Sequence, residues 1–161
     1  MTIIIYLLLG SMLYYAGMIL WFIAGNLFSD SQWNSKDSPA VSVIIAIRNG
    51  EKSLPNLLTD LSAQDYSGEV EFILVDDEST DSTRKLNQEK SKLDKRFILE
   101  ISSNGDSSLR FKKRALDAGI KRAKNEWLLF TDVDCRLNPG WVTGMAAYFE
   151  DDVDYVVGYS E

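Results

Sequence analysis

Histidine is absent from the chain of 161 residues, and cysteine occurs only once, at Cys135. Without histidine, the chain cannot contain a Ser-His-Asp triad, a Cys-His pair or a histidine-ligated zinc site. A single cysteine cannot form a disulfide within the chain, which is compatible with a reducing compartment such as the cytosol. Any acid–base chemistry in this chain must therefore use carboxylates, lysines or tyrosines.

Basic residues are outnumbered by acidic ones, with 17 Lys and Arg against 24 Asp and Glu and a formal net charge of −7. This balance argues against sequence-independent binding of nucleic acid, which needs a basic surface to release the counterions of the phosphates. An anionic substrate would need a metal ion or a local basic patch. The chain length and a hydrophobic content of 45% are sufficient for one domain with its own core.

Charged residues are also missing from the first 29 positions. Residues 3–28 are apolar and, at about 1.5 Å per residue, long enough to cross a hydrocarbon core of roughly 30 Å. We expect residues 1–28 to form one transmembrane helix and residues 29–39 to form a polar linker. A cleaved signal peptide is the alternative, although the run has no positively charged start and no obvious small-x-small cleavage site. Neither flank has an excess of Lys or Arg, so charge does not predict the orientation.

From about residue 40 onward, strand and helix patterns alternate. Residues 41–47 form a nearly continuous β-branched run, typical of a strand buried on both faces of a parallel sheet. Residues 53–64 place four leucines at helical spacing, with Ser53 expected as the N-cap. The alternation predicts an α/β fold, Rossmann-like, with a mostly parallel sheet and helices on both faces. The remaining expected elements are strands at 70–75, 97–101 and 127–131, the start of a strand at 154–157, and helices from 79 or 81 to 92, at 109–124 and from about 140 to 150.

Polar side chains follow three of the predicted strands. Arg48-Asn49 follows the first strand, Asp76-Asp77 the second and Asp132-x-Asp134 the fourth. In an open parallel sheet, ligands bind outside the carboxyl ends of the strands, so we expect these three loops to share one crevice. Helix capping alone explains such acids poorly, because a cap needs only one carboxylate per helix.

Asp132 and Asp134 stand one residue apart at the end of an apolar strand. In extended backbone, side chains alternate between the two faces, so we expect both carboxylates on one side. Two such carboxylates repel each other unless a cation lies between them, and a hard divalent cation, Mg²⁺ or Mn²⁺, is the first candidate. The alternative is that the Asp-x-Asp segment caps the next helix or forms a solvated turn.

Glycine-rich nucleotide motifs are missing: no Gly-x-Gly-x-x-Gly follows the first strand, and no Gly-x₄-Gly-Lys-Ser/Thr occurs. From about residue 40 to its end, the chain instead resembles the family 2 glycosyltransferases with a GT-A fold. It departs from the family's pattern at Phe111, where glycine is usual, and at Asp117, where asparagine is usual. Four segments carry the resemblance in the family's order and spacing: 41–49, 75–83, Lys112 together with 115–119, and 126–135.

The resemblance implies a nucleoside pocket after the first two strands. Asp77, or alternatively Asp76, would accept the imide N–H of a uracil-type base, which is a role for a fixed hydrogen-bond acceptor. Arg48 and Asn49 would line the same pocket. The alternative is that Asp76 or Asp77 only caps the following helix.

The resemblance also implies a diphosphate and metal site after the fourth strand. Asp134, with Asp132 beside it, would hold Mg²⁺ or Mn²⁺ against the diphosphate of a nucleotide sugar, and Lys112 would add a positive contact near the phosphates. Lys112 has a second interpretation, as part of a solvated helix face or of a patch facing anionic lipid headgroups. The other basic residues of that face are Arg110, Lys113, Arg114, Lys121, Arg122 and Lys124.

By the same resemblance, residues 40–161 would be the nucleotide-sugar-binding half of a GT-A domain. The enzyme would transfer a sugar, with inversion, from a UDP- or GDP-type donor to a hydroxyl of a lipid or saccharide acceptor. The general base is expected beyond residue 161, so we expect the chain to be the N-terminal portion of a longer membrane-anchored enzyme, or alternatively a truncated gene product, and to be inactive alone. The soluble domain is expected in the cytoplasm, where nucleotide sugars are made.

Two other functions remain open at this point. The first is a non-catalytic nucleotide-binding or scaffold module at a membrane. The second is a structural, membrane-tethered domain whose acidic residues only cap helices, and this function would involve no nucleotide binding.

Overall fold

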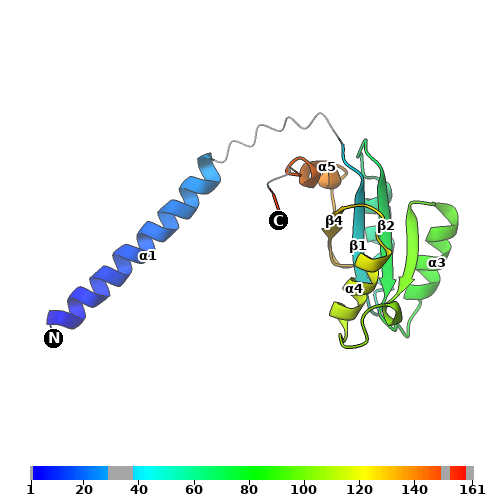
Figure 1. Cartoon of the computed structure of the whole chain (residues 1–161), viewed down its shortest axis with the longest axis horizontal. Coiled ribbons are helices and arrows are strands. Elements are labelled where there is room, and N and C mark those ends of the chain that lie inside the picture. The colour runs from blue at the N-terminus through cyan, green and yellow to red at the C-terminus, as the bar shows by residue number, and fades with distance from the viewer. Residues whose placement is uncertain (1, 29–37, 150–152, 159–161) are drawn as a thin grey trace. The chain divides into compact units, whose positions relative to one another are not determined.

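The computed structural model describes residues 2–28, 38–149 and 153–158 (Figure 1). The chain divides into two compact units, Met1–Trp33 and Asn34–Glu161. Most of the predicted linker, residues 29–37, lies outside the described residues.

The first unit contains the helix α1, Thr2–Phe28. Its segment Ile3–Gly25 has 23 residues and a mean hydropathy of 2.1, which is long and apolar enough to cross a membrane. The helix predicted over residues 1–28 is therefore confirmed, and α1 is a candidate membrane span.

The second unit is built on a four-stranded sheet with the order β3-β2-β1-β4. All three strand pairs are parallel, as predicted. Ile47 at the end of β1 pairs with Asp76 at the end of β2, and Asp76 pairs with the last residue of β3, Ile101. The carboxyl ends of three strands therefore meet at one edge. The strands are β1 (Val41–Ile47), β2 (Val70–Asp76), β3 (Phe97–Ile101) and β4 (Trp127–Phe130).

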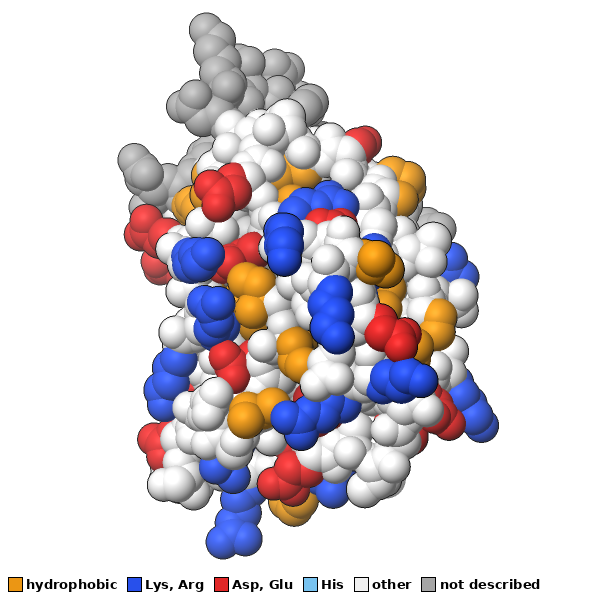
Figure 2. Space-filling view, turned by 90° about the vertical axis from the view of Figure 1, so that its right-hand side faces the viewer, with side chains coloured by type: hydrophobic (Ala, Val, Ile, Leu, Met, Phe, Trp, Pro, Cys, Tyr) orange, Lys and Arg blue, Asp and Glu red, His pale blue; other side chains and the backbone are white. Residues whose placement is uncertain are grey.

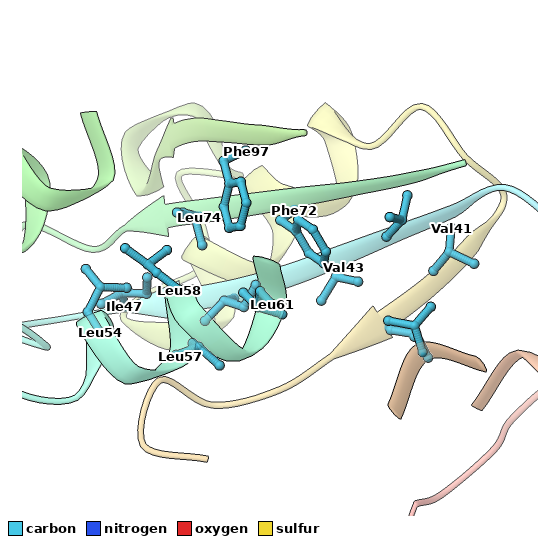
Figure 3. Packing of buried hydrophobic residues seen from close by; sticks show 14 residues of the cluster. Val41, Val43, Ile47, Leu54, Leu57, Leu58, Leu61, Phe72, Leu74 and Phe97 are labelled. Carbon is cyan, nitrogen blue, oxygen red and sulfur yellow. The ribbon is translucent and has the colours of Figure 1, made fainter. Parts of the chain in front are cut away.

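Helices cover both faces of this sheet. On one face, the leucines of α2 pack against strand residues such as Val43, Phe72 and Leu74 (Figure 3). On the other face, Ala115 and Ala118 of α4 pack in a separate cluster of buried residues. The helical elements are α2 (Leu54–Ser62), α3 (Thr83–Leu93), the short 3₁₀ turn η1 (Ser102–Asn104), α4 (Lys112–Arg122) and α5 (Trp141–Ala146).

Gly119 sets how closely α4 approaches the sheet. A Cβ atom at this position would lie 2.4 Å from Cγ2 of Ile44 and 3.1 Å from Cγ2 of Val75. Both neighbours belong to strands and are fully buried, so neither can move aside easily. The helix can therefore reach this depth only with glycine at position 119.

Several element boundaries differ from those predicted. The fourth strand ends at Phe130, where its pairing with Ile44 of β1 ends. Residues 153–158 are described but form no strand, because no neighbouring strand among the described residues pairs with them, and Tyr155 and Val157 are largely exposed. The helix predicted to end near Glu150 ends at Ala146, while residue 150 itself lies outside the described residues.

Two helices also begin later than the sequence pattern predicts. The third helix begins at Thr83, because Asp81 accepts a hydrogen bond from the backbone N–H of Thr83 and thereby closes a turn before it. The fourth begins at Lys112, after a turn in which the Leu109 N–H donates to the carbonyl of Asp106. Ser53 precedes α2, but its side chain makes no capping hydrogen bond.

Candidate functional site

A hollow of about 280 Å³ opens at the carboxyl edge of the sheet. Its walls come from the segments that follow β1, β2 and β3 and from the start of α4. This is the edge at which open parallel sheets bind ligands. The lining residues are Arg48, Asp77, Glu78, Ser102, Ser107, Leu109, Arg110, Phe111 and Arg114.

Asp77 and Arg48 face each other in this hollow. The Arg48 Nη1 atom lies 4.0 Å from Oδ2 of Asp77, and the Asp77 side chain is only 10% exposed. The backbone N–H of Asp77 donates to the carbonyl of Ile47, which fixes the residue at the end of β1. The residue before α3 is Ser82, so neither Asp77 nor Asp76 caps that helix. Capping therefore does not explain the acidic pair.

Asp76 is the last residue of β2 and is 4% exposed. Its Oδ1 atom is buried and has no hydrogen-bond partner among the described residues. Buried carboxylate oxygens are normally hydrogen-bonded. Asp76 lies next to the hollow in sequence but does not line it.

Asn49 lies beside the hollow and joins two of its loops. Its Oδ1 atom accepts a hydrogen bond from the backbone N–H of Thr80 at 2.8 Å, and its own N–H donates to Oγ of Ser79 at 3.0 Å. The next connection runs from the N–H of Glu51 to Oδ2 of Asp81. The loop after β1 is therefore fastened to the loop after β2, and Asn49 is not among the lining residues.

Strained backbone is concentrated around this hollow. Among the described residues, the non-glycine residues with positive φ are Asn49, Glu78 and Phe111, with φ values of 51°, 55° and 54°. Glu78 and Phe111 line the hollow, and Asn49 follows the lining residue Arg48. Such conformations cost free energy and are concentrated at functional sites.

An ion pair joins the start of α4 to the turn that follows β4. The Lys112 Nζ atom is 2.5 Å from Oδ1 of Asp132, and both side chains are more than half exposed. Lys112 follows Phe111, which lines the hollow, while Asp132 lies two residues after the end of β4. The structure thus brings together two segments that the sequence analysis assigned to the diphosphate end of the site.

The Asp132-Val133-Asp134 segment forms a turn, with the N–H of Cys135 donating to the carbonyl of Asp132. The extended conformation predicted for this segment is wrong, because β4 has left its ladder with β1 two residues earlier. Val133 packs against the hydrophobic core, whereas Asp132 and Asp134 are both exposed. Neither caps α5, which is preceded by Gly140. Both carboxylates are therefore accessible to a ligand from solvent.

The residues after this turn are anchored to α2. The Nε and Nη2 atoms of Arg136 donate to the two carboxylate oxygens of Asp60 at 2.7 Å and 3.0 Å. The backbone N–H of Leu137 donates to the same carboxylate at 3.1 Å. The hydrogen bond from the Arg136 guanidinium holds the pKa of Asp60 below its usual value, although burial opposes this shift. The 132–134 turn is thereby held between β4 and this anchor.

The carboxylates present fit a divalent cation bound together with a substrate. Among residues 2–28, 38–149 and 153–158, no group of three or more Cys, Asp or Glu side chains forms a ready-made metal site. Mg²⁺, however, is often bound by only one or two carboxylates, with substrate phosphates and water completing its shell. Asp132 already holds a cation, the ammonium group of Lys112. Asp132 and Asp134 therefore offer the hard oxygen atoms that this mode of binding needs.

Sequence reasoning missed part of the hollow. Arg110 and Arg114 line it, although both were interpreted as part of a solvated or lipid-facing helix surface. The signal that could have found them is their place at the end of the loop and the start of the helix that follow the third strand, at the ligand-binding edge. On other surfaces, basic residues are intermixed with acidic ones. Figure 2 shows this for the face on the side of α3. On α4, Lys121 pairs with Asp117.

Comparison with known protein families gives a match over most of the chain. A family model described as glycosyl transferase family 2 matches residues 42–160. An undecaprenyl-phosphate 4-deoxy-4-formamido-L-arabinose transferase from Proteus mirabilis is 31% identical over 118 residues, which make up 72% of this chain. The match covers 35% of that protein, so the chain spans about a third of the length of such curated relatives.

Two solved structures are similar to the chain. A mannosyltransferase from Pyrobaculum calidifontis, in complex with GDP-Man and Mn²⁺, has a TM-score of 0.70 and 20% identity, and the match covers 91% of this chain and 43% of that one. The poly(ribitol-phosphate) β-N-acetylglucosaminyltransferase TarS from Staphylococcus aureus, as the fragment 1–349 in complex with UDP-GlcNAc, has a TM-score of 0.53 and 34% identity. That match covers 67% of this chain and 30% of the other. The predicted partial GT-A architecture is confirmed by these neighbours.

Proposed function

The chain belongs to glycosyl transferase family 2, and from this membership we propose that residues 40–161 bind the nucleotide-sugar donor of a glycosyl transfer reaction. The observation that carries the proposal is that Asp77 and Phe111 line one hollow. Lys112, the next residue after Phe111, forms an ion pair with Asp132. An elongated ligand with a polar base at one end and a diphosphate at the other matches this arrangement.

In this proposal the nucleobase lies against Asp77. A carboxylate only accepts hydrogen bonds, so it suits the N–H group on the edge of uracil or guanine. The Nη1 atom of Arg48 lies 4.0 Å from this carboxylate. Both donor types have support, because one structural neighbour was solved with UDP-GlcNAc and another with GDP-Man.

The diphosphate would lie toward Lys112 and the 132–134 turn. Arg110 and Arg114 add positive charge to the wall of the hollow. We propose that Asp134 and Asp132 hold Mg²⁺ or Mn²⁺, with Lys112 exchanging its contact with Asp132 for one with a phosphate oxygen. The metal, when bound, neutralises charge on the leaving diphosphate. Several structural neighbours were solved with Mn²⁺.

The reaction would proceed in one displacement. The oxygen of an acceptor hydroxyl attacks the anomeric carbon while the bond from that carbon to the diphosphate oxygen breaks, which inverts the configuration. The hydroxyl proton passes to a general base, and the nucleoside diphosphate leaves with the electron pair of the broken bond. No described residue is assigned as this base, so the role that we propose for residues 40–161 is donor binding.

We further propose that α1 anchors the enzyme in a membrane with the second unit in the cytoplasm, the compartment in which nucleotide sugars are made. Such an anchor would favour a lipid-linked acceptor, with a saccharide acceptor as the alternative. A non-catalytic nucleotide-binding module at a membrane remains the second candidate function, because no described residue is assigned as the general base.

Calorimetric titration tests the proposal. The full chain, in detergent micelles, would be titrated with UDP and with GDP in the presence of Mn²⁺. We expect one of the two to bind, and Asp77→Ala to weaken that binding about tenfold or more, since a hydrogen bond to a charged group is lost. Asp65→Asn is the matched control, because Asp65 is an exposed residue that bonds Thr143 away from the hollow. If neither nucleotide binds to the folded chain, the proposal is wrong.

A further inference from the structure

Phe111 combines a strained backbone with an exposed ring. Its φ and ψ angles are 54° and −144°, a conformation that glycine adopts easily and a residue with a Cβ atom avoids. Phe111 as a whole residue is 70% exposed. The family pattern places glycine at this position, so this chain carries a bulky side chain where the backbone alone would favour none.

Packing of the described core does not explain why this position carries an aromatic ring. The conformation itself is fixed by the start of α4, because the Phe111 carbonyl accepts hydrogen bonds from the N–H groups of Arg114 at 2.9 Å and Ala115 at 3.2 Å. The ring, however, belongs to neither of the two hydrophobic clusters that form the described core. Phe111 is instead one of the residues that line the hollow.

The ring also differs from the rest of that wall. Apart from Leu109, the other lining side chains are polar or charged, and Asp77 stands among them. A planar, aromatic ligand with a polar edge would match both features, since its face can stack on an aromatic ring while its edge donates to a carboxylate. The lining does not include Lys112, Asp132 or Asp134, the residues proposed to contact the diphosphate and its metal ion.

We propose that Phe111 stacks against the nucleobase of the donor. This inference rests on the proposed function and assigns to Phe111 a part of the binding affinity that the family's glycine cannot supply. Stacking depends little on the identity of the base, because every base has an aromatic face. Phe111 therefore sets the strength of nucleoside binding, and Asp77 sets the choice of base.

Substitution of Phe111 by glycine distinguishes the effect of the ring on binding from the effect of the strained backbone on stability. Phe111→Gly removes the ring and also relieves the strain at positive φ, so the thermal midpoint of the unliganded variant should be unchanged or higher than that of the wild type. We expect the same variant to bind UDP or GDP, whichever the wild type binds, about tenfold more weakly. Phe111→Tyr keeps an aromatic ring and should bind within about twofold of the wild type.

Pyrophosphate with Mn²⁺ is the probe that distinguishes the base from the phosphates. Its affinity, measured by competition against the bound nucleotide, should be the same for the wild type and for Phe111→Gly. An equal loss for pyrophosphate and nucleotide would overturn the inference, because the residue would then act through the start of α4. Unchanged nucleotide binding by the folded glycine variant would overturn it as well. If the wild type itself binds neither UDP nor GDP, the failure lies with the proposed function.

Discussion

The ammonium group of Lys112 lies 2.5 Å from the carboxylate of Asp132, although the two residues are 20 positions apart in the sequence. This ion pair joins the start of α4 to the turn that follows β4. Because Phe111 precedes Lys112 and lines the hollow at the ends of the other three strands, the pair connects the proposed base and diphosphate ends of one site.

Removal of the Lys112 charge should weaken nucleotide binding without affecting the fold. We expect Lys112→Gln to lower the affinity for the nucleoside diphosphate by about three- to tenfold, because a positive contact to the phosphates is lost. The free energy of unfolding should change by less than about 1 kcal/mol, since both partners of the pair are exposed. Lys121→Gln, which removes an exposed partner of Asp117 on the same helix, is the control and should bind as the wild type does. Equal effects of the two substitutions would contradict the assignment of Lys112.

Asp134→Ala should abolish the effect of the metal on nucleotide binding. In the wild type, we expect removal of Mn²⁺ by EDTA to reduce the affinity for the nucleotide, whereas the variant should bind with the same low affinity in both conditions. Asp154→Ala, at an exposed position outside the site, should keep the response of the wild type. A persistent Mn²⁺ response in Asp134→Ala would show that this carboxylate does not hold the ion.

The close approach of α4 to the sheet predicts a large cost for Gly119→Ala. The added methyl group would meet Ile44 and Val75 at distances well below van der Waals contact, so we expect a loss of about 1–3 kcal/mol in the free energy of unfolding, measured with urea. Gly144→Ala in α5 is the matched control, because nothing lies within 4 Å of its added Cβ atom. That substitution should be neutral or should stabilise the helix by up to about 1 kcal/mol. A neutral Gly119→Ala would contradict the packing described here.

The Asp60–Arg136 pair predicts a specific dependence of stability on pH. The folded state holds the pKa of Asp60 below the ordinary value of 3.8. A lowered pKa contributes stability that is fully present above the unfolded-state pKa and is lost as the pH falls through the folded-state pKa. The advantage of the wild type over Asp60→Asn should therefore be about 1–3 kcal/mol at pH 7 and should shrink below about pH 4.

Denaturant titrations of both proteins between pH 7 and pH 2 provide this measurement. The comparison with Asp60→Asn removes the contributions of other carboxyl groups with lowered pKa values, such as Asp94 and Asp117, because these are present in both proteins. A difference in stability that stays constant over the whole range would contradict the role given to the Asp60 carboxylate.

The regular parts of the fold could be predicted because their signals are local. The β-branched run 41–47 and the leucines at 54, 57, 58 and 61 specify a buried strand and an amphipathic helix without reference to the rest of the chain. The parallel order of the strands then follows from the alternation of strands and helices. The same alternation was sufficient to predict that Asp77 and Asp132 lie at the same edge of the sheet.

The missed features depend on contacts between distant segments. Asp60 and Arg136 are 76 positions apart, and no periodic pattern marks either residue as a partner of the other. The turn at Val133 arises where β4 leaves β1, which depends on how far their pairing extends. Arg110 was missed because α4 begins at Lys112 and leaves Arg110 in the preceding turn. Boundaries of this kind depend on side-chain hydrogen bonds that sequence periodicity does not report.

The central claim is that one nucleotide and its metal ion contact both the hollow and the 132–134 turn. The most direct test is a set of amide nuclear magnetic resonance spectra of the full chain in detergent micelles, with UDP or GDP and with either Mg²⁺ or Mn²⁺. We predict that the nucleotide shifts the amide signals of Asp77, Glu78 and Phe111, and that Mn²⁺ in the presence of the nucleotide broadens those of Val133 and Asp134. Shifts and broadening confined to other parts of the sheet, or broadening near Asp134 with no change at Asp77, would contradict the claim.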